Sequence, residues 1–490
     1  MLGAWNLVLQ EAEPRRADWM RPSQNGPTNK WTTLPSKIAL KTANDTQLLE
    51  PPRFQPVLVE PRTEPCIGES FRVSSALPKA GPMNSKPILF RPWALGLMMT
   101  LLQIIVAVGL IAPEGPLSYR YDTLIQHDSY WFANIVDRGY ETTVPPISHK
   151  MMEVSNVAFF PAYPAIAAVL HYGLRLSIYD ALLVTAQAAA WGFWSYFFLF
   201  CERWNISPLL QFFGALSILA HPTAFFLVAG YSESLFMMGL FGFMFWSTAE
   251  GKGAKALAVL HGSLMSATRI VGIPCAAYPV VQTVFRDGWR GLVEVRCWWR
   301  RYATPAGLMV GATLGAGLFF FYCLLRWGRW DMYMLTQQSG WAIIPDYLAV
   351  FKPSSYHWLV PALNNPTEAS QMTMTLGGIL LLAVILCELL PVVRRRFPGT
   401  TRVGFYFCAA VIYYISVSGV ASVEMESMLR YEFCVHALIV LAILHFLHQL
   451  PAPRLWVRAS GMAAIALLSA AGLSVQGWYV WNFTRGNWVA

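Results

Sequence analysis

Long apolar runs separated by short polar stretches recur from Phe90 to the end of the chain. A helix needs about 17–25 mostly apolar residues to cross the hydrocarbon core of a membrane, and these runs have that length. They predict nine spans, at 92–112, 178–200, 208–229, 232–249, 303–325, 374–393, 403–422, 430–449 and 459–481. The run 255–285 begins and ends at basic clusters, so we expect a hairpin of two half-spans there, for about eleven helices in total. The pattern indicates an all-α polytopic membrane protein.

The composition agrees with this pattern after residue 85. Of the 490 residues, 55% are hydrophobic and only 13% are charged, whereas a soluble domain carries roughly 25% charged residues. Residues 1–85 are instead polar and rich in proline, and predict a disordered cytoplasmic tail. A coding start near Met83 is the alternative interpretation of this segment. Residues 86–490 are expected to form one membrane domain.

The formal charge of +9 comes from short basic clusters between the apolar runs. These clusters lie at 251–255, 286–301, 392–402 and 451–458, and the positive-inside rule makes each of them cytoplasmic. Such scattered clusters argue against nucleic-acid binding. The polar loops 113–155 and 326–373 then fall on the outer side, and no phosphate-binding glycine loop is present in the sequence. We therefore expect the chemistry on the outer side, without a cytosolic nucleotide.

The eight cysteines are scattered, mostly inside apolar runs, and form no CxxC pair, so neither a disulfide framework nor a zinc site is supported. Asp128, Glu424 and Glu426 could in principle bind a divalent cation. No local ligand spacing requires one, and no metal ligand is assigned.

The first outer loop carries the most distinctive pattern. If 126–138 is helical, Asp128, Trp131, Phe132 and Ile135 share one face, which predicts a helix in the membrane interface with a carboxylate at the end of an aromatic stripe. A carboxylate there could serve a reaction between a polar acceptor and a lipid-borne group. Alternatively, Asp128 only caps the helix.

Other acidic residues of this loop are weaker candidates. Asp122 is a second, less favoured choice, and Asp137 and Glu141 are expected to be solvated. The loop is followed by AFFPAYP, in which Pro161 and Pro164 are expected to prevent a regular helix start.

Several motifs in order along the chain carry a resemblance to a known family. They are DSYWFANIVDRGYE from Asp128, AFFPAYP, HPTAFFLVAGYSESLF (221–236), SATRIVGIP (266–274), WGRWDMYMLTQQSGW (327–341), SMLRYEF (427–433) and the ending TRGNWVA. From about residue 90 to 490 the chain resembles GPI mannosyltransferases of the PIG-V type and their prokaryotic relatives, in the type C (GT-C) superfamily of glycosyltransferases. One departure is His127, where that family commonly has tryptophan.

The resemblance implies a GT-C-like helical bundle that transfers mannose from a polyprenyl- or dolichyl-phosphate donor, with inversion, on the outer or lumenal face. Such a transfer needs a base for the acceptor hydroxyl and a cation for the departing phosphate. Asp128 is the expected base, with His127 as a substrate hydrogen-bond partner or a second proton carrier.

Arginines are the expected phosphate ligands, because a guanidinium can bind two phosphate oxygens at once. Arg269 is placed at the outer tip of the 255–285 hairpin, and Arg430 opens a span. An ion pair between Arg430 and the preceding glutamates, Glu424 and Glu426, is the competing interpretation for that residue.

Three further residues are expected to bind substrate. Glu233 lies at an outer turn and would bind acceptor hydroxyls, although simple exposure in the turn is an equal alternative. Tyr163 and Tyr431 lie in the motifs that carry the resemblance. His221 is expected to be a hydrogen-bonded core histidine, while Gln337, Gln338 and Trp341 are weak candidates for contact with sugar or lipid.

Membrane lipids, a lipid-linked sugar donor, a lipid or glycan acceptor and a small membrane subunit are the partners that this resemblance allows. The membrane would be the plasma membrane in a bacterium and the endoplasmic reticulum in a eukaryote. A flippase or transporter for lipid-linked sugars is the alternative function, although no paired internal repeats are visible. A receptor or scaffold is a third interpretation, which leaves Arg269 without a role.

Overall fold

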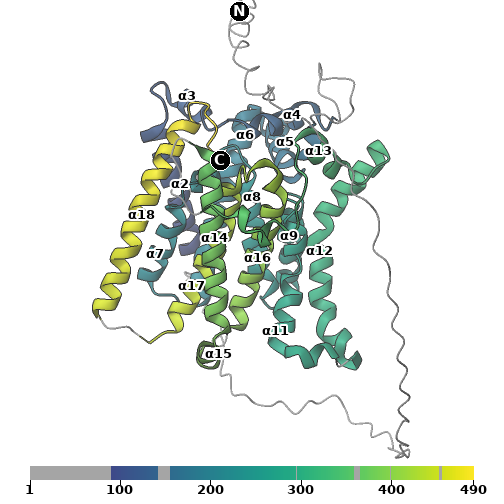
Figure 1. Cartoon of the computed structure of the whole chain (residues 1–490). Coiled ribbons are helices and arrows are strands. Elements are labelled where there is room, and N and C mark those ends of the chain that lie inside the picture. Colours follow the sequence, from purple (N-terminus) through teal and green to yellow (C-terminus); the bar gives the residue numbers. More distant parts are fainter. Residues whose placement is uncertain are drawn as a thin grey trace, which may run out of the picture. The chain divides into compact units, whose positions relative to one another are not determined.

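The computed structural model describes residues 90–141, 155–293, 295–357, 365–397, 399–451 and 455–489. The tail predicted for residues 1–85 lies outside these residues. Within the described part of the chain every regular element is helical (Figure 1). Seven helices are long and apolar enough to cross a membrane. The prediction of an all-α polytopic membrane protein is thus confirmed.

The seven long helices match seven of the predicted spans. They are Phe90–Ile111 (α2, Phe90–Ile104, with a π-helical continuation), Ile178–Arg203 (α6), Trp298–Trp327 (in α12, Val295–Trp327), Thr367–Leu389 (in α14, Pro366–Leu389), Thr400–Val423 (α16, Thr400–Val420, with a 3-10 turn), Met428–Gln449 (α17) and Leu455–Phe483 (α18). Exposed apolar side chains such as Leu467 and Leu468 on α18 are about three-quarters accessible, as expected for a surface that faces lipid.

The remaining helices are shorter. They are α3 (Leu117–Asp122), α4 (Asp128–Arg138), α5 (Ala162–Leu174), α7 (Pro208–Leu219), α8 (Glu233–Ser247), α9 (Lys252–Ser266), α10 (Gly272–Cys275), α11 (Tyr278–Val293), α13 (Met332–Gly340) and α15 (Pro391–Arg396). The spans expected at 208–229 and 232–249 are thus α7, a 3-10 turn at Ala224–Leu227, and the 15-residue α8. Helix α8 is almost wholly buried in protein, where a helix need not match the membrane thickness.

The two prolines of AFFPAYP do not prevent a helix, contrary to the prediction. Helix α5 begins at Ala162, with Pro161 in the N-cap position and Pro164 in the first turn. The first-turn N–H groups have no intrahelical acceptor, so proline there removes no hydrogen bond.

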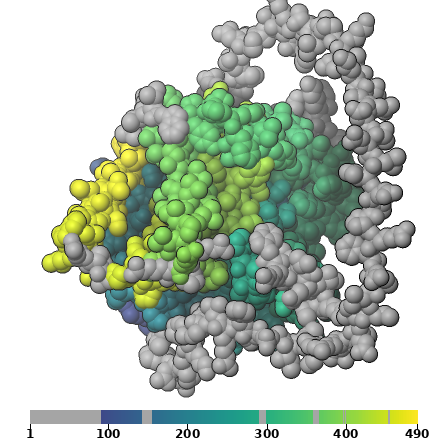
Figure 2. All heavy atoms as spheres, turned by 60° about the horizontal axis from the view of Figure 1, so that its bottom comes forward, coloured from purple at the N-terminus to yellow at the C-terminus, as the bar shows by residue number. Residues whose placement is uncertain are grey.

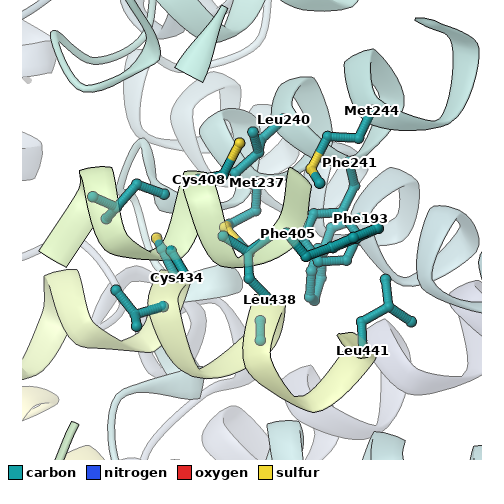
Figure 3. Packing of buried hydrophobic residues seen from close by; sticks show 14 of the residues in the cluster. Phe193, Met237, Leu240, Phe241, Met244, Phe405, Cys408, Cys434, Leu438 and Leu441 are labelled. Carbon is teal, nitrogen blue, oxygen red and sulfur yellow. The ribbon is translucent and has the colours of Figure 1, made fainter. Parts of the chain in front are cut away.

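The core of the bundle lies where α6, α8, α16 and α17 meet. Figure 3 shows Phe193 of α6, Phe241 of α8, Phe405 of α16 and Leu438 of α17 converging, all fully or almost fully buried. This packing fixes the first turns of α8 and α17, which carry site residues.

The hairpin predicted at 255–285 is present as α9, a tight turn, α10 and α11. Helix α9 packs closely on α12, where a Cβ at Gly315 would lie 2.0 Å from the carbonyl oxygen of Ser263. The Ser266 hydroxyl donates to the carbonyl of Ala312 at 2.6 Å. Small residues and hydroxyls of this kind allow close helix packing in membranes, and here they hold the turn that carries Arg269.

Helices α3, α4 and α13 lie at one end of the bundle, and α15 and the α11 end of the hairpin lie at the other (Figure 1). That second end comes forward in Figure 2, where the green atoms of α14 and α15 lie between the yellow atoms of α18 and the teal atoms of α11 and α12. The predicted basic clusters at 286–301 and 392–402 belong to this second end. Polar loops and basic clusters are therefore separated along the bundle axis.

Candidate active site

Two carboxylates and two guanidiniums form a connected network at the α4 end of the bundle. Arg430 donates from Nη1 to Oδ2 of Asp128 at 2.6 Å, and its Nε lies 3.2 Å from Oε1 of Glu233. Arg269 donates from Nη2 to the same Glu233 oxygen at 2.9 Å. Four residues that the sequence singled out separately, on α4, α8, the hairpin turn and α17, are thus brought together.

A close approach of two loops brings the start of α4 near the turn before α8. The N–H of Gly230 donates to the carbonyl of Leu124, and a Cβ at Gly230 would lie 2.5 Å from Cδ1 of Ile125 and 2.8 Å from Oγ of Ser129. A larger residue at position 230 would have to displace these side chains.

Asp128 does not serve as the N-cap of α4. The N-cap position is occupied by His127, whose φ of 47° is unusual for a residue other than glycine, and Asp128 is the first helical residue. The carboxylate of Asp128 is directed to Arg430, with about a fifth of its side chain exposed. The capping interpretation is therefore wrong, and the carboxylate remains accessible.

The network is electrically balanced and deeply buried. Glu233 is 1% exposed and Arg430 is 4% exposed, so the alternative of Glu233 lying exposed in a turn is wrong. Burial of an unpaired charge is very costly, and here each charge has an opposite partner. Oε2 of Glu233 has no hydrogen-bond partner among the described residues. That buried oxygen therefore retains acceptor capacity that no described residue uses.

Aromatic rings surround the Arg430 guanidinium. Its central carbon lies 5.2 Å from the ring centroid of Tyr231, 5.6 Å from that of Tyr431 and 6.0 Å from that of Trp488. Arg269 lies 5.1 Å from the Tyr431 ring. Tyr431 therefore contacts both arginines by cation–π geometry, which places this predicted residue in the network.

Glu424 and Glu426 do not form the ion pairs that were the alternative for Arg430. The ion pairs of Arg430 within the described residues are with Asp128 and Glu233. Burial raises the pKa of Glu426, while the Arg430 charge opposes this shift. No group of three or more His, Cys, Asp or Glu side chains in the described part of the chain is arranged to hold a metal ion.

Tyr163 does not take part in the network. Its side chain is fully buried, its hydroxyl donates to the carbonyl of Leu182 at 2.8 Å, and its ring packs edge-on against Phe132. These contacts give Tyr163 a role in holding α4 and α5 on α6.

The remaining carboxylates of the first outer loop lie apart from the network of Asp128, Glu233, Arg269 and Arg430. Asp122 is the last residue of α3, and its side chain is exposed. Partial burial of the carboxyl group still raises its pKa, and the charge of Asp180 adds to this shift. Asp137 is 64% exposed and lies 3.8 Å from Arg138, as expected for a solvated residue. Glu141 differs from the expectation, because its Oε2 is buried without a partner among the described residues.

His221 is a buried, hydrogen-bonded histidine, as predicted. Its Nε2 lies 2.7 Å from Oε2 of Glu432, and its Nδ1 lies 3.0 Å from the Thr223 hydroxyl. Glu432 carries no distinctive signal in the sequence, because a carboxylate two residues after Arg430 gives no sign of which helix it faces.

His127 packs against the C-terminal segment. Its Nε2 lies 3.2 Å from the carbonyl oxygen of Asn487, and its ring meets Trp488 edge-on at 5.0 Å. Burial lowers the pKa of His127, with the Asn487 hydrogen bond opposing this shift. The imidazole is therefore neutral at pH 7, which favours a hydrogen-bonding role over that of a charged acid. The spacing of the motifs could not show that Asn487 and Trp488 pack against the residue that precedes α4.

We expect His127 to make the protein less stable in mild acid. A folded-state pKa below the unfolded value means that only the unfolded chain gains a proton as the pH falls through about 6.5, so stability present at pH 7 is lost at pH 5. His127→Gln should reduce the drop in melting temperature between pH 7 and pH 5, measured by thermal unfolding in detergent. An unchanged drop would show that His127 titrates normally. His357, which is exposed, provides the matched control as His357→Gln.

Comparison with known proteins yields structural likeness only. No family model matches the chain, and no curated relative matches it. The chain is similar to ArnT from Cupriavidus metallidurans bound to undecaprenyl phosphate, with a TM-score of 0.45, 15% identity, and 80% of this chain and 68% of that chain covered. The apo state of ArnT gives a TM-score of 0.43 at 17% identity, with the same coverage.

A second similar structure is the archaeal oligosaccharyltransferase AglB from Archaeoglobus fulgidus, in complex with an inhibitory peptide and a dolichol-phosphate. Its TM-score is 0.43 at 11% identity, with 81% of this chain and 56% of that chain covered. At such values the likeness supports no conclusion about function, which rests on this chain's own residues.

Proposed function

We propose that the protein is a type C glycosyltransferase that moves a hexose, mannose by the sequence resemblance, from a polyprenyl-phosphate donor to a lipid or glycan acceptor with inversion. The observation that carries this proposal is the network of Asp128, Glu233, Arg269 and Arg430. It joins an accessible carboxylate to two guanidiniums at one end of a membrane bundle, which are the groups that this transfer needs.

In the proposed reaction the acceptor hydroxyl oxygen attacks the anomeric carbon from the face opposite the phosphate. The bond from this carbon to the phosphate oxygen breaks, and the phosphate leaves with the bonding electron pair. Asp128 takes the proton of the acceptor hydroxyl. Arg430 orients that carboxylate before the reaction through the ion pair at 2.6 Å.

The two arginines are suited to different roles. Arg430 is engaged with both carboxylates, whereas the one ion pair of Arg269 within the described residues is with Glu233. A guanidinium has five N–H donors, so Arg269 retains donors for the departing phosphate. We assign the phosphate to Arg269, and the positioning of Asp128 to Arg430. Glu233, with its free oxygen, would bind an acceptor hydroxyl.

The outer or lumenal face is the proposed location of the site. The position of the basic segments supports this location. The network lies at the end of the bundle away from α11 and α15, and the positive-inside rule assigns the basic α11 and α15 segments to the cytoplasm. A GPI precursor in a eukaryote, or an envelope glycolipid in a bacterium, fits this location as acceptor.

The test is transfer by purified protein reconstituted in vesicles, with polyprenyl-phosphate [³H]mannose and total lipid extract of the host as acceptor source. We expect label in a new lipid or glycan product. If the label only crosses the bilayer and stays on the donor, the protein is a flippase or transporter instead. If the label neither enters a product nor crosses the bilayer, the donor class is wrong.

We expect Arg269→Gln to raise the KM for the donor by about 10-fold or more, because a hydrogen bond to a charged group contributes roughly 1.5–3 kcal/mol. Lys352→Gln, which removes an exposed cation of the outer loop, is the matched control and should leave the KM unchanged. Equal donor KM values for Arg269→Gln and the unaltered protein would remove Arg269 from the phosphate site. Initial rates at varied donor concentration measure both variants.

A further inference from the structure

Three aromatic side chains meet beside the network, at the end of the bundle that carries α4 and α13. The Trp131 and Phe159 rings stack with centroids 6.1 Å apart and an interplanar angle of 17°. Trp341 meets both rings edge-on, at 5.5 Å from Trp131 and 5.8 Å from Phe159. We name this group the aromatic platform. All three side chains are partly exposed, whereas the aromatic rings of the bundle core are buried.

The indole N–H of Trp341 is buried and has no hydrogen-bond partner among the described residues. Buried donors are nearly always paired, so this one calls for an explanation. Three indoles elsewhere in the described chain are paired: Trp191 donates to the carbonyl of Trp93, Trp194 to Gln103 and Trp246 to Tyr196. Trp341 therefore differs from the structural tryptophans of the bundle.

The platform adjoins the network through two elements. Trp131 follows Asp128 by three residues on α4, so the two side chains lie on one face of that helix. Trp341 follows directly on α13, whose Tyr333 lies within electrostatic range of Arg269. Gln337 of α13 donates to the carbonyl of Ala158, which ties α13 to the segment that carries Phe159. The platform is thus built on α4, which carries Asp128, and on the segment after α13, whose first turn lies near Arg269.

We infer that the aromatic platform of Trp131, Phe159 and Trp341 is a binding subsite for a hexopyranose ring. The inference rests on the proposed function and names a recognition element for it. A pyranose presents C–H groups on one face and hydroxyls at its edge, so it can lie on an aromatic ring while a hydroxyl accepts from the Trp341 N–H. Ligand sites combine apolar walls with a few placed polar groups in this way. The ring is that of the donor sugar or that of a glycan acceptor, and the two have the same chemistry.

The first experiment measures binding without catalysis. Saturation-transfer NMR with methyl α-D-mannopyranoside and the purified full chain should show strongest saturation at protons of one ring face. We expect this signal to fall at least severalfold in Trp131→Ala and Trp341→Phe. The control is Trp330→Ala, because Trp330 is a 61% exposed tryptophan of the same outer loop whose ring meets Phe320, and it should keep the signal. An unchanged signal in Trp341→Phe and Trp131→Ala would overturn the inference.

The second experiment separates the two sources of the ring. Trp341→Phe retains an aromatic ring but removes the indole N–H together with the five-membered ring that carries it, which should raise one KM by about 3- to 10-fold with kcat nearly unchanged. A higher donor KM assigns the platform to the transferred sugar, and a higher acceptor KM assigns it to the acceptor glycan. Unchanged values for both substrates contradict the subsite. If the unaltered protein transfers nothing, the proposed function fails while the NMR result still decides whether the platform binds a pyranose.

Discussion

Asp128→Asn is expected to abolish sugar transfer while leaving the protein folded. Asparagine has nearly the same shape, and its amide oxygen can still accept from Arg430, so the packing around α4 should persist. It cannot take a proton from the acceptor hydroxyl, and loss of a general base lowers rates by about 10²- to 10⁴-fold. The measurement is the initial rate with polyprenyl-phosphate mannose at saturating donor, at equal amounts of monodisperse protein.

Asp137→Asn is the matched control, since Asp137 is on the same helix and its side chain is 64% exposed. It should transfer at the rate of the unaltered protein. If Asp128→Asn were as active as this control, Asp128 would not be the base, and Glu233 with its free carboxylate oxygen would be the next candidate. An unchanged donor KM together with a much lower kcat would assign Asp128 to the chemical step.

The long spans could be predicted from the sequence to within a few residues. Helices α6, α17 and α18 follow the apolar runs at 178–200, 430–449 and 459–481, because a helix that crosses the membrane must be apolar over its whole crossing. The shorter α8 departs from this rule, since it is almost wholly surrounded by protein, and the run at 208–229 is divided by the break between α7 and the 3-10 turn at Ala224–Leu227. Hydropathy alone therefore predicted longer spans there than the structure contains.

The charged residues of the network could be singled out from the sequence, but their pairing could not. Arg269, Glu233 and Arg430 stood out because a charge next to an apolar run is costly without a partner. The contact between Asp128 and Arg430, however, joins residues 302 positions apart and depends on how α4 and α17 pack. Proximity in sequence suggested Glu424 and Glu426 as the partners of Arg430, which is wrong because these residues lie outside its ion pairs.

The balance of charges also explains how a polar cluster can be buried in the bundle. Two carboxylates and two guanidiniums sum to zero, so the network carries no net buried charge. In the proposed reaction, the hydroxyl proton moves to Asp128 as the acceptor attacks and the leaving phosphate withdraws toward Arg269.

Arg430→Met is expected to lower both stability and activity. The substitution leaves Asp128 and Glu233 with one guanidinium between them, and removal of one partner from a buried ion pair costs about 3–5 kcal/mol. Thermal unfolding should therefore shift down by several degrees, and transfer should be lost because Asp128 is no longer oriented. Arg329→Met is the control, because Arg329 pairs with Asp331 at 2.9 Å on an exposed loop, where an ion pair has little effect on stability.

A double variant separates the two effects of losing Arg430. In Arg430→Met with Asp128→Asn the uncompensated carboxylate is gone, so the melting temperature should recover in part while transfer stays absent. The coupling between the two substitutions, taken from unfolding of the single and double variants, should be about 0.5–3 kcal/mol for groups in direct contact. Additive effects would mean that the ion pair seen at 2.6 Å does not hold Asp128 in place. Partial recovery without activity would instead establish that Arg430 acts on catalysis through the orientation and charge of Asp128.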